Sequence, residues 1–185
     1  YCDPEHPLQR MIAEEIASFT GEPVGTSGID GCGAPVAAVS ALGLARAYST
    51  LGTAIRNMDA DARASTVATA MVDYPELIQA PGMPDTVLSE QLDAVVKSGA
   101  AGVLCVGLRS GASVVVKISD GATRAAYPVA LWALEATGHL PSEQMQQLLP
   151  QVTRPVIGGV QDNAPREVGG WVPGADLEPL VGENA

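Results

Sequence analysis

The chain has 185 residues, of which 46% are hydrophobic, and carries a formal net charge of −11 at pH 7. Nucleic-acid binders and proteins of anionic membrane surfaces concentrate Lys and Arg, and this chain has only ten, so we expect neither partner. No apolar run approaches the roughly 18 residues that span a bilayer, and the chain as given opens with no signal-peptide pattern.

The cysteines Cys2, Cys32 and Cys105 are odd in number and far apart. They form no C-x-x-C pair, which argues against a disulfide framework and favours a reducing compartment. We therefore expect a cytoplasmic protein. Because the chain begins at Tyr1 rather than at methionine, we also expect its natural amino terminus to lie upstream.

The first third of the chain predicts helices. Asp3-Pro4 pairs a capping side chain with a proline, and apolar residues then recur at helical spacing, so a first helix is expected over 4–19. A glycine-rich loop leads to Pro35, where an alanine-rich second helix is predicted to begin. A third helix is expected over 64–72.

The pattern then changes from helix to strand. Asp85 is expected to cap a short helix that ends at Leu92. Runs of valine and other apolar residues between glycine turns predict strands next. These strands are expected over 94–97, 103–108 and 113–118.

Helices return after the strands, over 125–137 and over a shorter segment that Ser142 is expected to cap and that ends near 149. Beyond Thr153, Gly and Pro dominate. We therefore expect two parts: a folded region of residues 1–150 and an extended tail over 151–185.

A lysine and a serine stand side by side at the predicted end of a strand, in Lys97-Ser98-Gly99. A lysine whose pKa is lowered by burial or nearby cations can remove a proton from a serine, as in Ser-Lys acyl-transfer enzymes. Lys97, facing a cleft, is therefore the candidate catalytic base. The alternative is a solvated lysine on a glycine-rich hairpin, which is the common situation for surface lysines.

The loop 28–35, which reads G-I-D-G-C-G-A-P, is the second candidate site. Its backbone N–H groups, just ahead of a predicted helix, could bind a carboxylate or an oxyanion. The alternative is an ordinary loop at a helix entry with a buried cysteine. His6 and His139 have no Asp or Glu at the spacing of a zinc-protease motif.

Four segments occur in the order seen in the bacterial L-asparaginase II family, of the thermolabile or Rhizobium type, which the chain resembles over nearly its whole length. They are 3–9 (DPEHPLQ), 28–35 (GIDGCGAP), 97–103 (KSGAAGV) and 117–125 (KISDGATRA). The resemblance implies an α+β fold related to serine β-lactamases and glutaminases, with a helical cluster beside an antiparallel sheet.

In that family, a nucleophilic serine with a lysine three residues later lies upstream, as does a C-S-G-K-H segment. This chain has no S-x-x-K, so it resembles the carboxy-terminal half to two-thirds of such an enzyme, and its fold is expected to be incomplete. Three positions depart from the family pattern: Tyr74, Met83 and Ala101 stand where His, Arg and Glu are usual. These departures raise the alternative of an inactive or re-specialised relative.

The resemblance also assigns roles to residues. Lys97 matches a strand lysine that helps to activate the serine. Cys32 matches a cysteine near the active site, which could contact substrate or hold Zn²⁺ together with a Cys and a Lys of the absent segment. Asp30 and the amides of Gly31 and Gly33 are expected to recognise the charged ends of an amino acid.

The predicted function is that of an amidohydrolase of the L-asparaginase type, which releases ammonia from the side-chain amide of asparagine through an acyl-enzyme. It is expected to require no cofactor, to act on a small amide amino acid, and to form a homo-oligomer. Without the serine, residues 1–185 alone are expected to be inactive. The alternative is a non-catalytic module that binds an amino acid or an amide.

Overall fold

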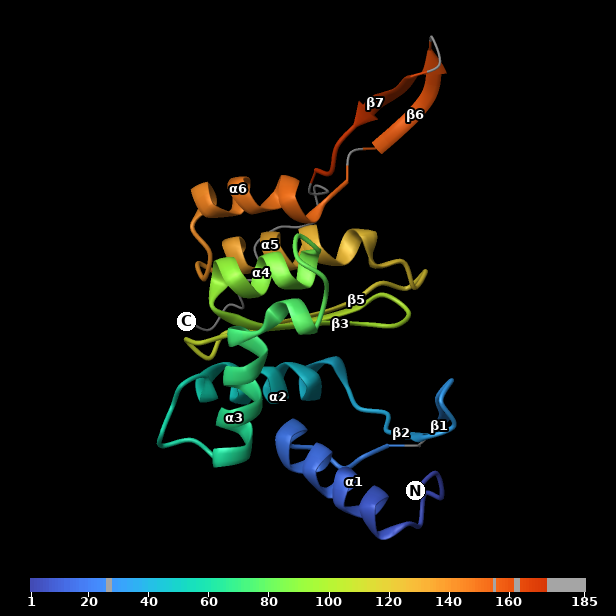
Figure 1. Cartoon of the computed structure of the whole chain (residues 1–185), viewed down its shortest axis with the longest axis vertical. Helices are drawn as coiled ribbons and strands as arrows, with labels where there is room; N and C mark the ends of the chain where they lie inside the picture. Colours follow the sequence, from blue (N-terminus) through green and yellow to red (C-terminus); the bar gives the residue numbers. More distant parts are fainter. Residues whose placement is uncertain (26–27, 155, 162–163, 173–185) are drawn as a thin grey trace.

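The computed structural model describes residues 1–25, 28–154, 156–161 and 164–172. An antiparallel sheet lies in the middle of the molecule, and helices cover both of its faces (Figure 1). Helices and antiparallel strands thus occupy separate layers, and the fold is α+β as expected. No helix of the described segments is long and apolar enough to cross a bilayer.

The central sheet has the order β3-β4-β5 and consists of β3 (Ala94–Gly99), β4 (Val103–Leu108) and β5 (Ser113–Lys117). Val96 lies opposite Val106, and Lys97 lies opposite Cys105. The three predicted strands are therefore confirmed, with β3 at one edge of this sheet. Their apolar runs, separated by glycine turns, form the part of the sequence with the clearest pattern.

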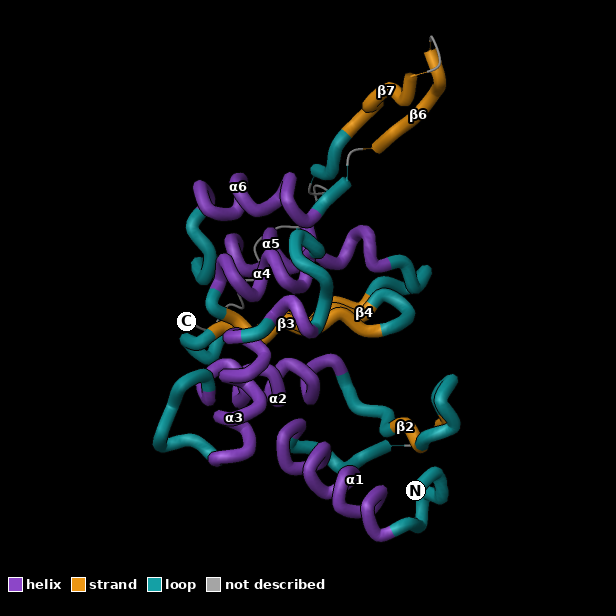
Figure 2. The backbone as a smooth tube through the Cα atoms, viewed as in Figure 1, coloured by secondary structure: helices purple, strands orange, loops and turns teal. Residues whose placement is uncertain are grey.

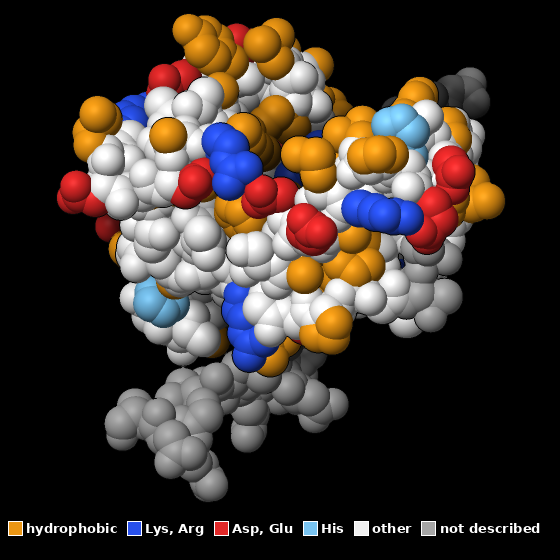
Figure 3. Space-filling view, turned by 90° about the horizontal axis from the view of Figure 1, so that it is seen from below, with side chains coloured by type: hydrophobic (Ala, Val, Ile, Leu, Met, Phe, Trp, Pro, Cys, Tyr) orange, Lys and Arg blue, Asp and Glu red, His pale blue; other side chains and the backbone are white. Residues whose placement is uncertain are grey.

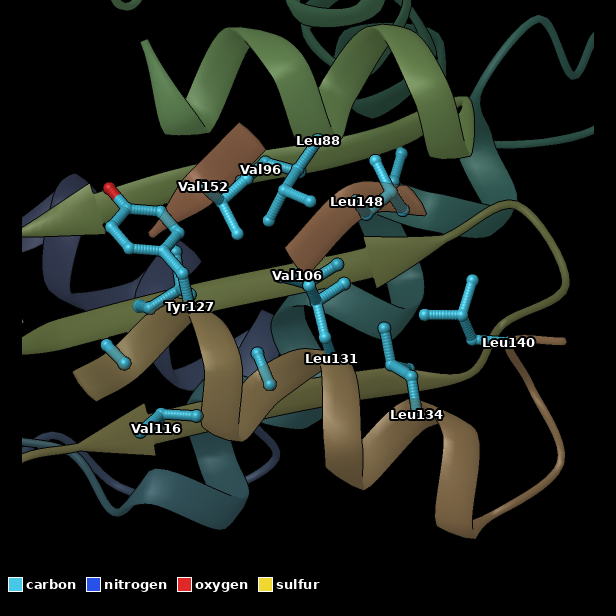
Figure 4. Packing of buried hydrophobic residues seen from close by; sticks show 14 of the residues in the cluster. Leu88, Val96, Val106, Val116, Tyr127, Leu131, Leu134, Leu140, Leu148 and Val152 are labelled. Carbon is cyan, nitrogen blue, oxygen red and sulfur yellow. The ribbon is translucent and has the colours of Figure 1, made fainter. Parts of the chain in front are cut away.

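One face of the sheet carries α4 (Pro84–Leu92), α5 (Ala126–Ala136) and α6 (Ser142–Val152). Their apolar side chains form the larger core with those of alternate strand residues, as Figure 4 shows. The fully buried members include Leu88, Leu104, Leu131 and Leu148. α5 is buried along most of its length, which accounts for its almost entirely apolar sequence.

The other face carries α2 (Ala41–Ala54) and α3 (Ala62–Asp73), and α1 (Pro7–Thr20) packs against α2 from outside (Figure 1). Two glycines let α2 approach β4 closely. A Cβ added at Gly52 would overlap the carbonyl group of Leu108, and one added at Gly107 would overlap the carbonyl oxygen of Tyr48. At these two points the helix backbone rests directly on the strand backbone.

The first helix begins at Pro7, three residues later than predicted. Asp3 does not cap it, because its Oδ1 accepts the Glu5 N–H (2.9 Å) in a local turn. The cap is His6, whose Nδ1 accepts the Leu8 N–H at 3.1 Å. Pro7 then takes the first helical position, where its missing N–H costs nothing.

The second helix also begins later than predicted. Pro35 is not helical but belongs to β2 (Pro35–Val36), which pairs with β1 (Gly28–Ile29). α2 begins at Ala41, after Ser40, whose Oγ accepts the Gly43 N–H at 2.9 Å. The glycine-rich loop therefore joins two short strands instead of entering a helix directly.

The predicted third helix and the helix over 125–137 are confirmed as α3 and α5. Two predicted caps are wrong. Ser142 is the first residue of α6 and makes no capping bond, while Asp85 lies inside α4, whose cap position is occupied by Met83. Two short 3₁₀ turns, η1 (Pro75–Leu77) and η2 (Thr123–Ala125), precede α4 and α5.

The tail predicted over 151–185 is partly a hairpin. β6 (Val156–Gln161) and β7 (Ala164–Gly169) pair antiparallel and project away from the layers (Figure 2). Trp171 ties the end of this hairpin to the end of α6, because its Nε1 donates to the Arg154 carbonyl oxygen at 3.2 Å. The rest of the predicted tail, 173–185, lies outside the described residues.

Candidate functional site

Lys97 lies near the end of β3 and is exposed. Because side chains alternate along a strand, Lys97 shares the sheet face of Val95, which packs with α2 and α3. Its Nζ donates to the Ser98 carbonyl oxygen. Within the described part of the chain, the Lys97 amine forms no ion pair with a carboxylate.

Ser98, the neighbour of Lys97, is not a nucleophile for it. The Ser98 hydroxyl donates to Oδ2 of Asp85 at 2.8 Å, and the Ser98 N–H donates to the same oxygen at 2.8 Å. Strand alternation directs the two side chains to opposite faces. The Lys-Ser pair of the sequence is therefore not a catalytic dyad.

A buried polar cluster surrounds Asp85, which is only 1% exposed. Besides the two bonds from Ser98, it accepts the Tyr127 hydroxyl on Oδ1 at 2.9 Å. Gln79 completes the cluster: its Oε1 accepts the Asp85 N–H (2.9 Å), and its Nε2 lies 3.4 Å from Ser98 Oγ. Burial raises the pKa of Tyr127 to about 12, so this side chain acts as a neutral hydroxyl donor.

Sequence reasoning missed this cluster. It assigned Asp85 to a helix cap because Asp follows Pro at the start of a helical pattern. The residues that meet at Asp85 come from α4, β3 and α5 and lie 13 and 42 positions apart in the chain. The available signal was a second polar position one turn further on, Ser89, on the same face of α4.

The loop between β1 and β2 is organised by Asp30. Its Oδ1 accepts the N–H groups of Cys32 (2.7 Å) and Ala34 (3.1 Å), and its backbone N–H donates to the Ala34 carbonyl oxygen at 3.0 Å. The Gly33 N–H donates to the Asp30 carbonyl oxygen at 3.1 Å. One carboxylate oxygen of Asp30 and the Gly33 amide are thus engaged within the loop, whereas the Gly31 amide bonds to no described residue.

Cys32 is exposed at this loop. The expectation of a buried cysteine at a helix entry is therefore wrong, because the loop joins two short strands outside the core. Gly33 has a φ of +84°, which favours glycine at this position. The loop lies beside α1, and no hydrogen bond or ion pair joins it to Lys97 among the described residues.

The described residues do not fit a zinc site by themselves. No group of three or more His, Cys, Asp and Glu side chains comes together in the part of the chain that the structure describes. Around Cys32, Asp30 is the acidic residue of the same loop, and its Oδ1 is already engaged with backbone N–H groups. A structural zinc site needs four ligands, and this loop provides one thiol.

The three positions that depart from the family pattern belong to different parts of the chain's secondary structure. Tyr74 ends α3 and is 57% exposed, and Met83 precedes α4 and is 39% exposed. Ala101 lies in the turn between β3 and β4 with a φ of +55°, and its carbonyl oxygen accepts Lys117 Nζ at 2.6 Å. Met83 also lines a cavity of about 610 Å³, together with Arg124 and Tyr127.

Comparison with protein families gives a match to one of them. The model of the family described as L-asparaginase II matches residues 1–167, which include the loop around Asp30, the Lys97 strand and most of the terminal hairpin. No curated protein matches the chain.

Proposed function

Since the chain belongs to the L-asparaginase II family, we propose that it forms one wall of the active site of an enzyme that converts L-asparagine to L-aspartate and ammonia. The observation that carries this proposal is Lys97, which combines an exposed amine, a place near the end of an edge strand and no carboxylate partner among the described residues. A general base must accept a proton. An ion pair with a carboxylate would favour the protonated form of the lysine amine, which cannot accept one.

In the proposed reaction, Lys97 as a neutral amine takes the proton of a serine hydroxyl while the serine oxygen attacks the side-chain amide carbon. Lys97 then gives this proton to the amide nitrogen, which leaves as ammonia, and water cleaves the acyl-serine to give aspartate and restore the serine hydroxyl. The serine is not Ser98, which is bonded to Asp85, and the 185 residues contain no S-x-x-K. We therefore propose that the nucleophile comes from outside these residues.

The loop around Asp30 is proposed to bind the charged ends of the amino acid. Among the described contacts, the Gly31 N–H and Asp30 Oδ2 take part in no hydrogen bond. The Gly31 N–H is proposed to donate to the carboxylate of the amino acid, and Asp30 Oδ2 to accept from its ammonium group. Cys32 is proposed as a substrate contact in the same loop. Binding of Zn²⁺ by Cys32 is also a proposal, and it requires further ligands from outside the described residues. No step of the proposed reaction depends on zinc.

A second candidate function is a non-catalytic module that binds an amino acid. The changes at Tyr74, Met83 and Ala101, where the family usually has His, Arg and Glu, favour it. Such a module would retain the loop and its ligand but would form no acyl-enzyme.

The experiment that separates the two is a Lys97 series in the whole protein. Lys97→Ala should lower kcat for asparagine by at least about 100-fold, the low end for loss of a general base. Lys97→Arg should fail equally, because a guanidinium stays protonated. The matched control is Lys117→Ala, the other lysine of the chain, which bonds to turn carbonyls and should leave kcat within threefold.

Residues 1–185 on their own should release no ammonia. Ammonia release by the purified 185 residues that Lys97→Ala does not change would overturn the proposed base. Calorimetric binding of L-aspartate by a whole protein that releases no ammonia would instead establish the binding module.

We further propose that the protein is a cytoplasmic homo-oligomer. All three cysteines are free, which agrees with a reducing compartment. Apolar side chains of α1 and β2 are exposed, which agrees with a covered surface.

A further inference from the structure

Helix α4 runs beside the edge strand β3 and bonds to its backbone with two side chains. Asp85 and Ser89 are four residues apart, so they lie on the same face of the helix. Ser89 Oγ donates to the Ala94 carbonyl oxygen at 2.8 Å, at the start of the strand. Asp85 accepts the Ser98 N–H at 2.8 Å, towards its end. We call Asp85 and Ser89 the α4 clamp.

The clamp holds a carboxylate in an unusual place. Asp85 is 1% exposed and forms no ion pair among the described residues, so three neutral donors satisfy it. Burying an unpaired charge is costly, and hydrogen bonds offset only part of the cost. A serine or an asparagine could bond to one strand amide at less cost. The carboxylate is the acidic group that joins α4, α5 and the strand edge at one point.

The point that Asp85 fixes is the peptide adjoining Lys97. Its Oδ2 holds both the N–H and the hydroxyl of Ser98, while the Lys97 amine lies on the Ser98 carbonyl oxygen. The atoms of Ser98 therefore connect the buried carboxylate on one side with the lysine amine on the other. A shift of the strand end would move the carbonyl oxygen to which the Lys97 amine donates.

We propose that Asp85 is a positioning residue for Lys97. It holds the end of β3 through Ser98 and thereby sets where the Lys97 amine stands. The inference rests on the proposed function, since positioning matters for the reaction only if Lys97 is the base. Displacement of a catalytic group by about 1 Å costs up to about 100-fold in rate.

The first test compares two substitutions of Asp85 in the whole protein. Asp85→Ala removes both bonds between Asp85 and Ser98 and should lower kcat for asparagine by about 10- to 100-fold, with KM within threefold. Asp85→Asn should recover most of kcat, because its oxygen can accept from Ser98 while the Tyr127 hydroxyl rotates to accept from its amide. If kcat of Asp85→Asn is as low as that of Asp85→Ala, the reaction depends on the charge of Asp85 and not on its hydrogen bonds to Ser98. That result would overturn the proposal.

A matched control separates positioning from general loosening of the fold. Tyr127→Phe removes the Tyr127 hydroxyl from Asp85 Oδ1 but leaves in place both bonds by which Asp85 Oδ2 holds Ser98. It should lower the melting temperature while kcat stays within threefold. A fall in kcat that merely follows the melting temperature across all variants would contradict a positioning role. If Asp85→Ala does not fold, Ser98→Ala, which keeps the N–H bond, should change kcat in the same direction by a smaller factor.

The second readout does not depend on activity. The chain has two lysines, Lys97 and Lys117, so reductive ¹³C-methylation of residues 1–185 gives two lysine signals that Lys97→Arg assigns. Asp85→Ala should move the Lys97 signal towards that of a free lysine and leave the Lys117 signal in place. An unchanged Lys97 signal would overturn the inference. A moved signal, with no turnover by the whole wild-type protein, would keep the inference and refute the proposed function.

Discussion

At the scale of the residue, the structure predicts which of the three cysteine thiols react quickly. Cys2 and Cys32 are exposed, whereas Cys105 is buried in β4. Burial raises the pKa of the Cys105 thiol to about 11, partly offset by the positive charge of Lys97 across the strand pair. Because the thiolate is the reactive form, a rise of two pKa units reduces the thiolate of Cys105 about 100-fold.

A disulfide reagent at pH 8 should therefore titrate two thiols of the native protein quickly and the third only slowly. Cys2→Ser and Cys32→Ser should each remove one fast thiol, and unfolding in urea should expose the slow one. If Cys32 reacted as slowly as Cys105, the exposed loop described for it would be wrong.

Acidic residues show what the sequence reveals at this scale and what it leaves out. Asp3 and Asp85 both stand beside a proline at a helix start, where a capping role is the simplest interpretation. Neither caps its helix, because Asp3 closes a local turn and Asp85 bonds to a strand and to another helix. A side chain accepts from the nearest unpaired donor, and only the folded chain determines which donor is nearest.

At the scale of the element, the contact between α2 and β4 depends on Gly52 and Gly107. In an exposed helix, replacing glycine by alanine stabilises the folded protein by up to about 1 kcal/mol, because alanine has the higher helix propensity. Here the new Cβ would overlap the Leu108 carbonyl group, so we expect the opposite sign. Overpacking of this kind costs about 1–3 kcal/mol, and Gly107→Ala should cost as much.

Urea denaturation measures both variants. Gly28→Ala is the matched control, because a Cβ there meets no atom within 4 Å, and it should change the free energy of unfolding by less than about 0.5 kcal/mol. A stabilising effect of Gly52→Ala would mean that α2 does not rest on β4 as described.

Elements differed in how well the sequence predicted them. The strands β3, β4 and β5 follow from dense valine runs between glycine turns, a pattern that few other structures share. The hairpin β6–β7 was missed because Gly and Pro are frequent in its sequence and dilute the alternation that marks a strand. The start of α2 was missed because Pro35 resembles a first helical residue, and only the pairing of β1 with β2 assigns it to a strand.

At the scale of the whole molecule, an apolar surface lies over α1 and β2. Leu8, Met11, Ile12 and Val36 are 41–62% exposed there, and Figure 3 shows hydrophobic side chains at the surface on the underside of the molecule. Some of them border a cavity of about 290 Å³ between α1 and β2. Large exposed apolar patches mark interaction surfaces or aggregation sites.

Residues 1–185 should therefore associate in a concentration-dependent manner in sedimentation velocity experiments. Leu8→Glu with Ile12→Glu should shift the sample towards monomer, because charges oppose burial of this surface. Met58→Glu is the control, since Met58 is 96% exposed and belongs to the turn between α2 and α3 and not to α1 or β2. A monomer at every concentration, with all three samples alike, would contradict a covered surface.

The sequence specified the whole molecule better than its parts. Four motifs in order predicted the family and the α+β class, and both predictions are confirmed. The candidate site was predicted only as separate pieces. Lys97 and the Asp30 loop are candidates that the sequence names, but the buried carboxylate of Asp85 depends on three elements meeting in space.

The α4 clamp also affects whether copies of this protein can pair through the edge strand β3. An uncovered edge strand is a template on which a second chain can add a strand, the first step towards insoluble fibres. On β3, the Ala94 carbonyl and the Ser98 N–H are occupied by the side chains of a neighbouring helix. The strand that carries the candidate catalytic lysine can thus remain open to a small molecule at Lys97 while α4 shields its outer backbone from another strand.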